Sequence, residues 1–309
     1  MNDHNLRTST IVVNKNDEQV ADTLEFLTSL EDVAQVEVIV VDASQGRLDY
    51  LRQRFPKIRW FDYVQPHGKR RTIAEQRNLG VCSARGDLIV FLDAGCCPAQ
   101  DWLQELVRPI ATEGEDIVFG AVTSKFRSTL HGQDVSYASS GGGYLSECST
   151  TNIAIRREVF DRVGYFDESI GFAEDVDFTW RAIDAGFKLC YAPSATVAHN
   201  WGTTSEDMWR AFRYGVGRVR LYRKHRSRLK NLLGVDFYAM AYALYVLFLP
   251  VAMAFPAYLL LLAIPLVRNM KRHPFTTVAY HLFYGAGMLS EFFHVPVLKG
   301  QRRAPSHAG

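Results

Sequence analysis

The sequence predicts an α/β fold with an open, parallel-rich sheet, followed by a C-terminal helical module that associates with a membrane. Two observations lead to this prediction. Across residues 10–122, short apolar runs alternate with amphipathic segments, which is typical of a parallel sheet covered by helices. Residues 237–267 then contain no charged side chain, and the nearby segment 218–230 contains seven Lys or Arg residues. We therefore expect a sheet domain at residues 1–205 and a basic, apolar module at residues 206–309.

The expected strands are short apolar runs, and the expected helices repeat apolar residues every three or four positions. Residues 36–41 are apolar apart from Glu37, as a parallel strand buried on both faces requires. The Ser-, Gly- and Thr-rich residues 123–150 predict a loop, which is either a surface connection or a lid over a site. In chain order, we expect strands at residues 10–13, 36–41, 58–64, 88–92, 116–122 and 152–155 and before Pro193 and His199, and helices after Asp17, at 48–54, 72–84 and 102–111, after Arg157 and at 173–185.

The composition excludes a peptide, a disordered tail and a small disulfide scaffold, because 309 residues with 48% hydrophobic side chains can bury a large core. The net charge of +2 hides an uneven distribution, since 15 of the 35 Lys and Arg but only 4 of the 33 Asp and Glu lie in residues 206–309. Five cysteines without CxxC spacing predict free thiols in a reducing compartment. The first ten residues lack the basic stretch and apolar run of a signal peptide, so we expect the sheet domain in the cytoplasm.

Polar side chains follow three of the expected strands. Asn14 comes after the first, Asp42 after the second and Asp93 after the fourth. Ligands of open α/β sheets bind beyond the carboxyl ends of the strands, so these residues predict a nucleotide site at that edge. The alternative for each aspartate is a plain helix cap.

Five segments in order resemble the inverting family 2 glycosyltransferases, which have the GT-A fold with a Rossmann-like sheet. They are IVVDAS at residues 39–44, the helix segment at 74–87, FLDAGCCP at 91–98, and the segments at 150–168 and 172–193, so the resemblance covers about residues 8–202. It implies an enzyme that transfers a sugar, with inversion, from a nucleotide-diphosphate sugar to an acceptor hydroxyl. It also implies that residues 1–205 form the catalytic domain and that Asp42 holds the nucleotide base.

The metal motif of that family is incomplete in this sequence. The family has FLDxD, and Gly95 stands where the second carboxylate would be, which leaves Asp93. The resemblance implies a divalent cation, Mn²⁺ or Mg²⁺, on the donor diphosphate, and one carboxylate with phosphate oxygens and water suffices to hold it. His199 matches a family histidine near the metal, and imidazole favours Mn²⁺. The alternative is a histidine that only caps a strand end.

The acidic pair Glu174–Asp175 matches the family's catalytic carboxylates, with Asp175 as the general base. Inversion at an anomeric carbon is a single displacement, so one carboxylate must accept the proton of the acceptor hydroxyl. The pair begins an expected helix, and a helix N-terminus favours the ionised carboxylate. The alternative is that both residues only cap this helix, on which Asp177 and Arg181 form an exposed i,i+4 pair.

Four further residues are assigned to the substrates. Asn14 is expected at the nucleotide sugar. Arg77 lies in the helix before the metal motif and is expected to meet the diphosphate, although a solvated basic face is an equal alternative. By resemblance, Asn152 lines the sugar or acceptor site. Trp201 is expected to stack on a sugar face, with a place in the core as the alternative.

The uncharged stretch at 237–267 is longer than one membrane-spanning helix requires and is interrupted by Pro250, Pro256 and Pro265. A second apolar stretch begins at residue 274, and basic clusters lie before, between and after the two stretches. Proline-hinged hairpins that enter the inner leaflet and return would keep all three clusters on the cytoplasmic side, and two spanning helices are the alternative. The amphipathic segment 208–228 is expected to lie on anionic headgroups.

These features predict an enzyme of the cell inner membrane with a cytoplasmic catalytic domain. Its partners would be the nucleotide-sugar donor, membrane lipids and a lipid-linked glycan acceptor of exopolysaccharide or cell-wall assembly. The absence of a QxxRW-type motif favours single transfers over processive synthesis. A soluble peptide or small-molecule acceptor, and a non-catalytic protein that binds sugar nucleotides, are the alternatives. Nothing else in the sequence indicates nucleic-acid binding, and the oligomeric state is left open.

Overall fold

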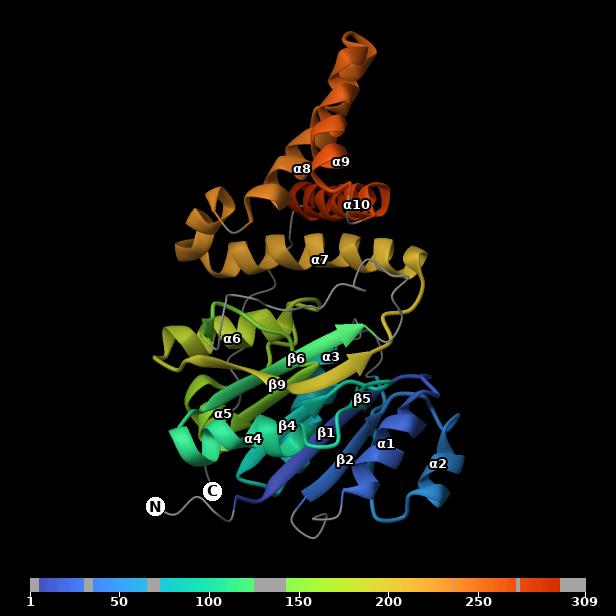
Figure 1. Ribbon diagram of the computed structural model, residues 1–309, viewed down its shortest axis with the longest axis vertical. Coiled ribbons are helices and arrows are strands. Elements are labelled where there is room, and N and C mark those ends of the chain that lie inside the picture. Colours follow the sequence, from blue (N-terminus) through green and yellow to red (C-terminus); the bar gives the residue numbers. More distant parts are fainter. Residues whose placement is uncertain are drawn as a thin grey trace.

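The fold is a single mixed sheet flanked by helices, with a separate helical layer above one edge of the sheet (Figure 1). The computed structural model describes residues 6–30, 36–65, 73–124, 143–234, 236–270 and 273–294. The main path of the sheet runs β3-β2-β1-β4-β8-β6-β9-β5, and β7 pairs with β9. The larger part of the expected lid, residues 125–142, lies outside the described residues.

The first half of the sheet is parallel, as expected. β1 (Thr8–Asn14) pairs with β2 (Val36–Asp42) on one side and with β4 (Leu88–Leu92) on the other, and β3 (Arg59–Asp62) extends the sheet beyond β2. β1 and β4 are buried along their whole length. Parallel pairing brings the carboxyl ends of β1, β2 and β4 to one edge, where Asn14, Asp42 and Asp93 were expected to meet.

The second half of the sheet is mixed. β8 (Asn152–Arg156) runs antiparallel between β4 and β6 (Ile117–Ser124). β9 (Leu189–His199) is one continuous strand parallel to β6, where the sequence indicated two short strands, because the pairing shifts register between Gly120 and Ala121 instead of breaking. The two-residue strands β5 (Cys97–Pro98) and β7 (Tyr144–Leu145) add antiparallel edges to β9.

The helices of the sheet domain lie close to their expected positions and pack a common core against the sheet. All five cysteines are free thiols, as expected. The largest buried side chains are aromatic and include Trp102, Trp180 and Phe91. The helices are α1 (Val20–Ser29), α2 (Asp49–Arg54), α3 (Ile73–Ser83), α4 (Trp102–Glu113), α5 (Arg157–Val163) and α6 (Glu174–Asp184).

α7 (Thr204–Lys224) crosses above the strand ends, and α10 (Pro274–Phe293) packs on it (Figure 1). A capping box of Thr203 and Glu206 fixes where α7 begins. The two helices approach closely because glycines face the partner's backbone. A Cβ atom at Gly215 would overlap the carbonyl of Tyr284, and one at Gly287 would overlap the carbonyl of Phe212. α7 and α10 therefore form one rigid roof over the edge of the sheet.

Beyond this roof the chain forms a protruding helical hairpin (Figure 1). η3 (Arg226–Leu233) leads into the outgoing arm, α8 (Phe237–Leu247) and η4 (Leu249–Met253), and the returning arm is η5 (Pro256–Leu262) and α9 (Ala263–Arg268). The rings of Tyr245 and Tyr258 stack across the two arms with centroids 4.9 Å apart. Within the described ranges we find no helix that combines the length and the apolar character needed to cross a membrane.

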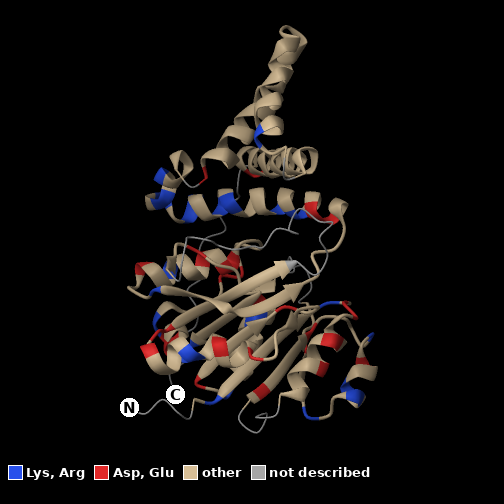
Figure 2. Ribbon diagram, viewed as in Figure 1, with Lys and Arg blue, Asp and Glu red and all other residues tan. Residues whose placement is uncertain are grey.

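The basic side chains of α7 correct one expectation. The sequence placed the segment 208–228 on anionic headgroups. Its Lys and Arg residues are spread along α7 and just beyond it (Figure 2), and most of them are paired with acids of the protein. Arg218 makes a bidentate bond to Glu147, Arg220 and Arg223 both bind Glu291, and Lys224 binds Asp177. These charges attach α7 to the rest of the chain, because opposite charges from distant segments meet on this helix.

Candidate active site

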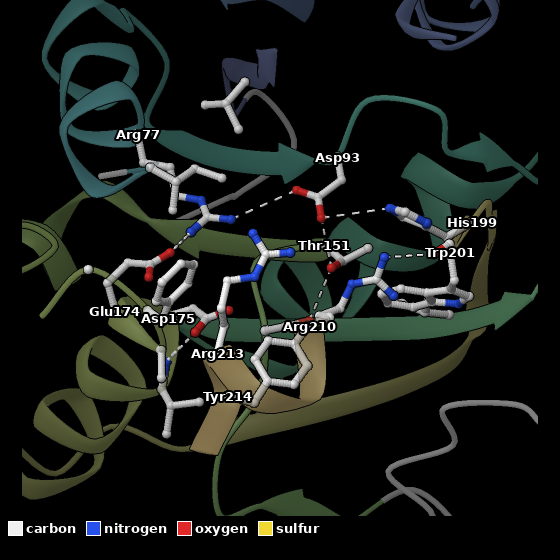
Figure 3. A pocket seen from close by; sticks show the side chains of 18 of the residues that line it. Arg77, Asp93, Thr151, Glu174, Asp175, His199, Trp201, Arg210, Arg213 and Tyr214 are labelled. Carbon is white, nitrogen blue, oxygen red and sulfur yellow. Dashed lines mark hydrogen bonds and ion pairs between the residues drawn. The ribbon is translucent and has the colours of Figure 1, made fainter. Parts of the chain in front are cut away.

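A pocket of about 700 Å³ lies between the carboxyl ends of the strands and the roof formed by α7 and α10 (Figure 3). Its lower side carries most of the residues that the sequence analysis selected. Its upper side comes from residues that were assigned to the membrane module. The charged and aromatic lining residues are Lys15, Arg77, Asp93, Phe119, Glu147, Phe172, Glu174, Asp175, His199, Trp201, Arg210, Arg213, Tyr214, Arg218, Tyr280 and Tyr284, and Asn14 also lines the pocket.

Asp93 lies at the centre of a polar cluster directly after β4. Its Oδ2 accepts a hydrogen bond of 3.0 Å from the Thr151 hydroxyl and lies 3.9 Å from Nε2 of His199. Its Oδ1 lies 3.9 Å from Nη2 of Arg77. The parallel β4 and the adjacent antiparallel β8 bring Asp93 and Thr151 together, and the end of β9 supplies His199.

The donor set of Asp93 and His199 fits a divalent cation held jointly with a bound diphosphate. Burial lowers the pKa of His199, which favours the neutral imidazole that ligates metals. Among the described residues, no three His, Cys, Asp or Glu side chains gather closely enough to hold a metal ion by themselves. Gly95 has a left-handed backbone with φ of +78°, a conformation that glycine adopts most easily, and it contributes no side chain. Phosphate oxygens and water would have to fill the remaining positions.

The side chain of Trp201 packs against the ring of His199. The indole stacks on the imidazole with centroids 4.4 Å apart and an interplanar angle of 23°. The Arg210 guanidinium lies 5.6 Å from the centre of the indole and donates to the Trp201 carbonyl at 2.6 Å. The expectation that Trp201 stacks on a sugar face stays a prediction, since Trp201 also lines the pocket. This arrangement fixes the plane of the His199 ring.

Arg77 and Glu174 form a buried ion pair on the opposite side of the pocket from His199 (Figure 3). Both side chains are about 5% exposed. Burial raises the pKa of Glu174 to about 7 against the opposing effect of Arg77. Because Arg77 shares its charge between Glu174 and Asp93, it connects the acidic pair to the expected cation position. Its expected contact with a diphosphate stays a prediction.

Asp175 faces the pocket from the first turn of α6. Ala173 precedes the pair with a left-handed φ of +67°, which turns the chain abruptly into the helix. Oδ1 of Asp175 accepts a hydrogen bond of 2.8 Å from the backbone N–H of Val176. This bond favours the carboxylate, but burial outweighs it and raises the pKa of Asp175. A carboxylate with a raised pKa is a stronger proton acceptor, as a general base requires.

Asn14 and Asp42 meet at the ends of β1 and β2, as expected. The Asn14 amide donates to Oδ1 of Asp42 at 3.4 Å, and the Ser44 hydroxyl donates to the same oxygen at 2.6 Å. Oδ1 of Asn14 and Oδ2 of Asp42 are buried and find no hydrogen-bond partner in the described part of the chain. Buried acceptors without donors are unfavourable, so they fit a ligand that carries N–H groups, as a nucleobase does. Asn14 lines the pocket, and Asp42 lies just behind it.

Asn152 is a structural residue, which corrects its assignment to the sugar or acceptor site. It is completely buried and does not line the pocket. Its amide donates to the carbonyls of Ala121 and Ala195, and its carbonyl accepts from Nε1 of Trp102 at 2.7 Å. The register shift between β6 and β9 leaves those two carbonyls without their usual partners, and Asn152 supplies the missing donors. Its neighbour Thr151 is the residue that faces the pocket.

Asn152→Ala is expected to destabilise the fold, by roughly 2–5 kcal/mol, because two buried carbonyls and one indole N–H lose their partners. Folded Asn152→Ala protein should keep the substrate affinity of the wild type, since the side chain does not reach the pocket. Urea unfolding measures the first effect. A matched control is Thr112→Ala on α4, which removes an exposed hydroxyl whose hydrogen bond goes to the Arg108 carbonyl of its own helix. An unchanged unfolding midpoint for Asn152→Ala would contradict this assignment.

The alternative interpretation of α6 included an exposed i,i+4 ion pair of Asp177 and Arg181, and the structure does not show such an exposed pair. The pair with Arg181 is instead a buried junction, because Asp177 is fully buried and also binds Lys224 of α7 and His225, which directly follows α7, at 2.7 Å each. α6 is thereby attached to α7, and the carboxylate of Asp175 is kept under the roof.

The sequence analysis missed the pocket residues of α7 and α10. Arg210, Arg213 and Tyr214 follow one another at helical spacing, so they share one face of α7, and Arg218 continues that face. This periodicity was visible in the sequence, but it could not distinguish a membrane surface from a substrate pocket. The lining of the pocket therefore extends beyond the expected domain boundary at residue 206.

Two family descriptions match the chain. "Glycosyl transferase family 2" matches residues 9–164, and "Glycosyl transferase family group 2" matches residues 89–288. The second match extends through α7 and into α10.

Similar curated proteins are glycosyltransferases and polysaccharide biosynthesis proteins. Glycosyltransferase AglE of Haloferax volcanii is 29% identical over 181 residues, which cover 56% of this chain and 58% of AglE. Pre-mycofactocin glycosyltransferase of Mycobacterium tuberculosis is 29% identical over 54% of this chain and 38% of its own length. Succinoglycan biosynthesis protein ExoM of Rhizobium meliloti is 27% identical over 58% of this chain and 62% of ExoM. The chain spans less than two thirds of each of these relatives.

Among solved structures, the mannosyltransferase PcManGT from Pyrobaculum calidifontis, in complex with GDP-Man and Mn²⁺, superimposes with a TM-score of 0.66 at 17% identity. The match covers 94% of this chain and 88% of PcManGT. GalNAc-T7 with UDP, GalNAc and Mn²⁺ superimposes with a TM-score of 0.52 at 17% identity over 64% of this chain and 44% of its own. At this level of identity the two structures show that the fold is shared.

Proposed function

Because the chain belongs to glycosyl transferase family 2, we propose that it transfers a sugar from a nucleotide-diphosphate donor to an acceptor hydroxyl in the pocket under α7. One observation supports this proposal: residues suited to hold a cation and a residue suited to accept a proton line the same pocket. Asp93 and His199 form a cation position at the carboxyl end of the sheet, and Asp175 supplies a proton acceptor from α6. Inverting transfer requires both, with the reacting carbon between them.

The donor would lie along the strand ends. Its base would meet Asp42 and Asn14, whose buried oxygens accept N–H groups, and its diphosphate would reach the cation position. A divalent cation held by Asp93 and His199 would stabilise the charge of the leaving diphosphate. Arg77 and Thr151 orient the Asp93 carboxylate for this role.

Asp175 would accept the proton of the acceptor hydroxyl. As that oxygen forms its bond to the anomeric carbon, the bond from the same carbon to the donor phosphate oxygen breaks and the nucleoside diphosphate leaves. The attack comes from the side opposite the leaving group, so the product has the inverted configuration. The ion pair of Arg77 and Glu174 holds the first turn of α6 in place during this step.

A panel of sugar nucleotides tests this function directly. Protein in enriched membranes is incubated with UDP-, GDP- and dTDP-sugars, Mn²⁺ or Mg²⁺ and a membrane lipid extract, and released nucleoside diphosphate is measured. We expect one donor to give release above the background of membranes that lack the protein. If no donor exceeds that background, a non-catalytic protein that retains the fold becomes the better account.

The hairpin of residues 237–268 supports a membrane location for the acceptor. It carries no charge from Phe237 to Val267, and its tip is strongly exposed, with Met253 91% and Phe255 69% accessible. A hairpin of this kind inserts its apolar tip among acyl chains and leaves the roof and pocket at the interface. We infer that the acceptor is a lipid-linked glycan on the cytoplasmic face of the inner membrane, used in polysaccharide assembly.

Polar substitutions at the tip are expected to release the protein from lipid. Met253→Asn combined with Phe255→Asn and Leu260→Asn should lower binding to phosphatidylglycerol-containing vesicles at least tenfold, since each buried apolar side chain contributes about 1.5–3 kcal/mol. Co-sedimentation measures this. Val64→Asn is a matched control, because Val64 is 75% exposed on the sheet domain. Equal vesicle binding by the triple variant and the control would contradict the membrane hairpin.

The same triple variant separates the two acceptor classes. If it retains full transfer to a water-soluble acceptor and the wild type shows no preference for lipid, then the acceptor is soluble and the hairpin only anchors. Deleting the module after residue 231 would not answer this question, because α10 packs on α7 and lines the pocket with Tyr280 and Tyr284.

A further inference from the structure

Arg213 presents an uncompensated positive charge to the pocket. The other arginines of the lining are neutralised by acids, since Arg77 pairs with Glu174 and Arg218 with Glu147, and Arg210 binds Asp207. Arg213 makes no ion pair with any residue that the structure describes. Its Nε donates only to a backbone carbonyl of its own helix, at 3.3 Å. Figure 3 shows its guanidinium directed into the pocket, toward the side where Arg77 and Asp93 lie.

Arg213 lies over an aromatic ring of the pocket lining. Its guanidinium lies 5.5 Å from the centre of the Phe172 ring. A Cβ atom on Gly217, one turn later in α7, would lie 2.8 Å from the Phe172 carbonyl, so the helix and this loop are in close contact. Phe172 is three residues before Asp175. The charge of Arg213 is therefore held near the expected general base, on an aromatic face that leaves its terminal N–H groups available.

A guanidinium without an acidic partner is suited to bind a phosphate group. A guanidinium presents a planar fork of N–H donors that matches phosphate oxygens, and charge-assisted bonds of this type are the strong ones. The reaction also needs more positive charge than the cation alone provides. The diphosphate gains negative charge as the sugar leaves, and the carboxylate of Asp93 already offsets part of the charge of the cation.

We propose that Arg213 binds a phosphate group in this pocket, at a position distinct from the cation position of Asp93 and His199. The inference rests on the proposed function in one respect, because it is the two substrates that bring phosphate to the pocket. The group is either the diphosphate of the donor or the phosphate of a lipid-linked acceptor. The chemistry is the same in both cases, and the experiment below distinguishes them.

The test compares Arg213→Gln with Arg226→Gln in the full chain. Arg226 is an exposed arginine of η3 that has no ion pair among the described residues and lies outside the pocket. Calorimetry measures the affinity of each protein for UDP and GDP with Mn²⁺, and for farnesyl phosphate and farnesol in detergent. Losing a charge-assisted phosphate contact is expected to weaken binding roughly tenfold or more for Arg213→Gln, with no change for Arg226→Gln.

The pattern across the probes decides the outcome. A loss confined to UDP or GDP assigns the donor diphosphate, and a loss for farnesyl phosphate but not farnesol assigns the acceptor phosphate. Unchanged affinity for every phosphate probe overturns the proposal, and so does an equal loss for farnesyl phosphate and farnesol. These measurements need no turnover. If Arg213→Gln loses phosphate affinity while no donor supports transfer, the phosphate site stands and the proposed transferase function fails.

Discussion

Asp175→Asn should lower kcat by about 10²–10⁴-fold, because the amide cannot accept the proton of the acceptor hydroxyl. Donor affinity should be unchanged, since Asp175 lies on α6, away from Asn14 and Asp42 at the ends of β1 and β2. The substitution is nearly isosteric, and the amide oxygen of asparagine can still accept the hydrogen bond from the backbone N–H of Val176. Steady-state kinetics with the donor found in the panel, combined with calorimetric donor binding, separate these two effects.

The control for this variant is Asp161→Asn, an exposed carboxylate on α5 outside the pocket. The pH profile adds a second readout. The base must be ionised, so kcat should fall as the pH drops through the pKa of the acidic pair. Burial raises the pKa of Asp175 and raises that of Glu174 to about 7, so this loss should occur at a higher pH than an exposed aspartate would give. Wild-type kcat in Asp175→Asn would remove Asp175 from the mechanism.

Asp93→Ala should reduce kcat/KM by roughly three orders of magnitude, because the pocket loses the carboxylate assigned to the cation on the leaving diphosphate. Asp93 is the carboxylate assigned to the cation, so Asp93→Ala should also weaken cation-dependent nucleotide binding, which calorimetry with and without Mn²⁺ measures. His199→Ala should have a smaller effect and should shift the preference from Mn²⁺ toward Mg²⁺, since imidazole favours the softer ion.

The matched control is Asp87→Asn, a half-exposed carboxylate at the other end of β4 that pairs with Arg7. It leaves the pocket untouched, so both the activity and the cation dependence should match the wild type. Cation dependence that survives intact in Asp93→Ala would show that the ion is held elsewhere, and the assignment of the donor diphosphate to this edge would fail with it.

The sheet domain could be predicted largely from local sequence patterns. β4 is a continuous apolar run, and β1 and β2 each contain a shorter one, at residues 11–13 and 38–41; such runs indicate buried strands. Their polar ends then determined where Asn14, Asp42 and Asp93 would lie, because parallel strands share one edge. The antiparallel direction of β8 was not predictable in this way, since a short apolar strand carries no information about which neighbour it joins.

Asn152 and Trp201 show why individual roles were harder to predict. The role of Asn152 depends on a register shift between β6 and β9, which are far apart in sequence, and no local pattern reveals such a shift. The indole of Trp201 packs on His199 two residues earlier and on Arg210 nine residues later, a contact that needs the turn into α7. Both residues belong to the site region, but tertiary contacts decided what they do there.

The amphipathic pattern of α7 was recognised but assigned to the wrong environment. A helix face of basic and aromatic residues can bind an anionic lipid surface or an acidic protein surface. Its partners Glu147 and Glu291 lie about 70 residues away on either side, so the pairing is visible only in the fold. The consequence for function is that the roof of the pocket and the base of the apolar hairpin are one continuous unit.

The position of the bound cation shows whether the pocket between the strand ends and α7 is the donor site. Crystals grown with Mn²⁺ and the nucleoside diphosphate of the active donor would be measured for anomalous difference density. The account predicts a single strong peak between Asp93 and His199, with the base beside Asp42. A peak outside this pocket, or a nucleotide bound away from the ends of β1 and β2, would contradict it.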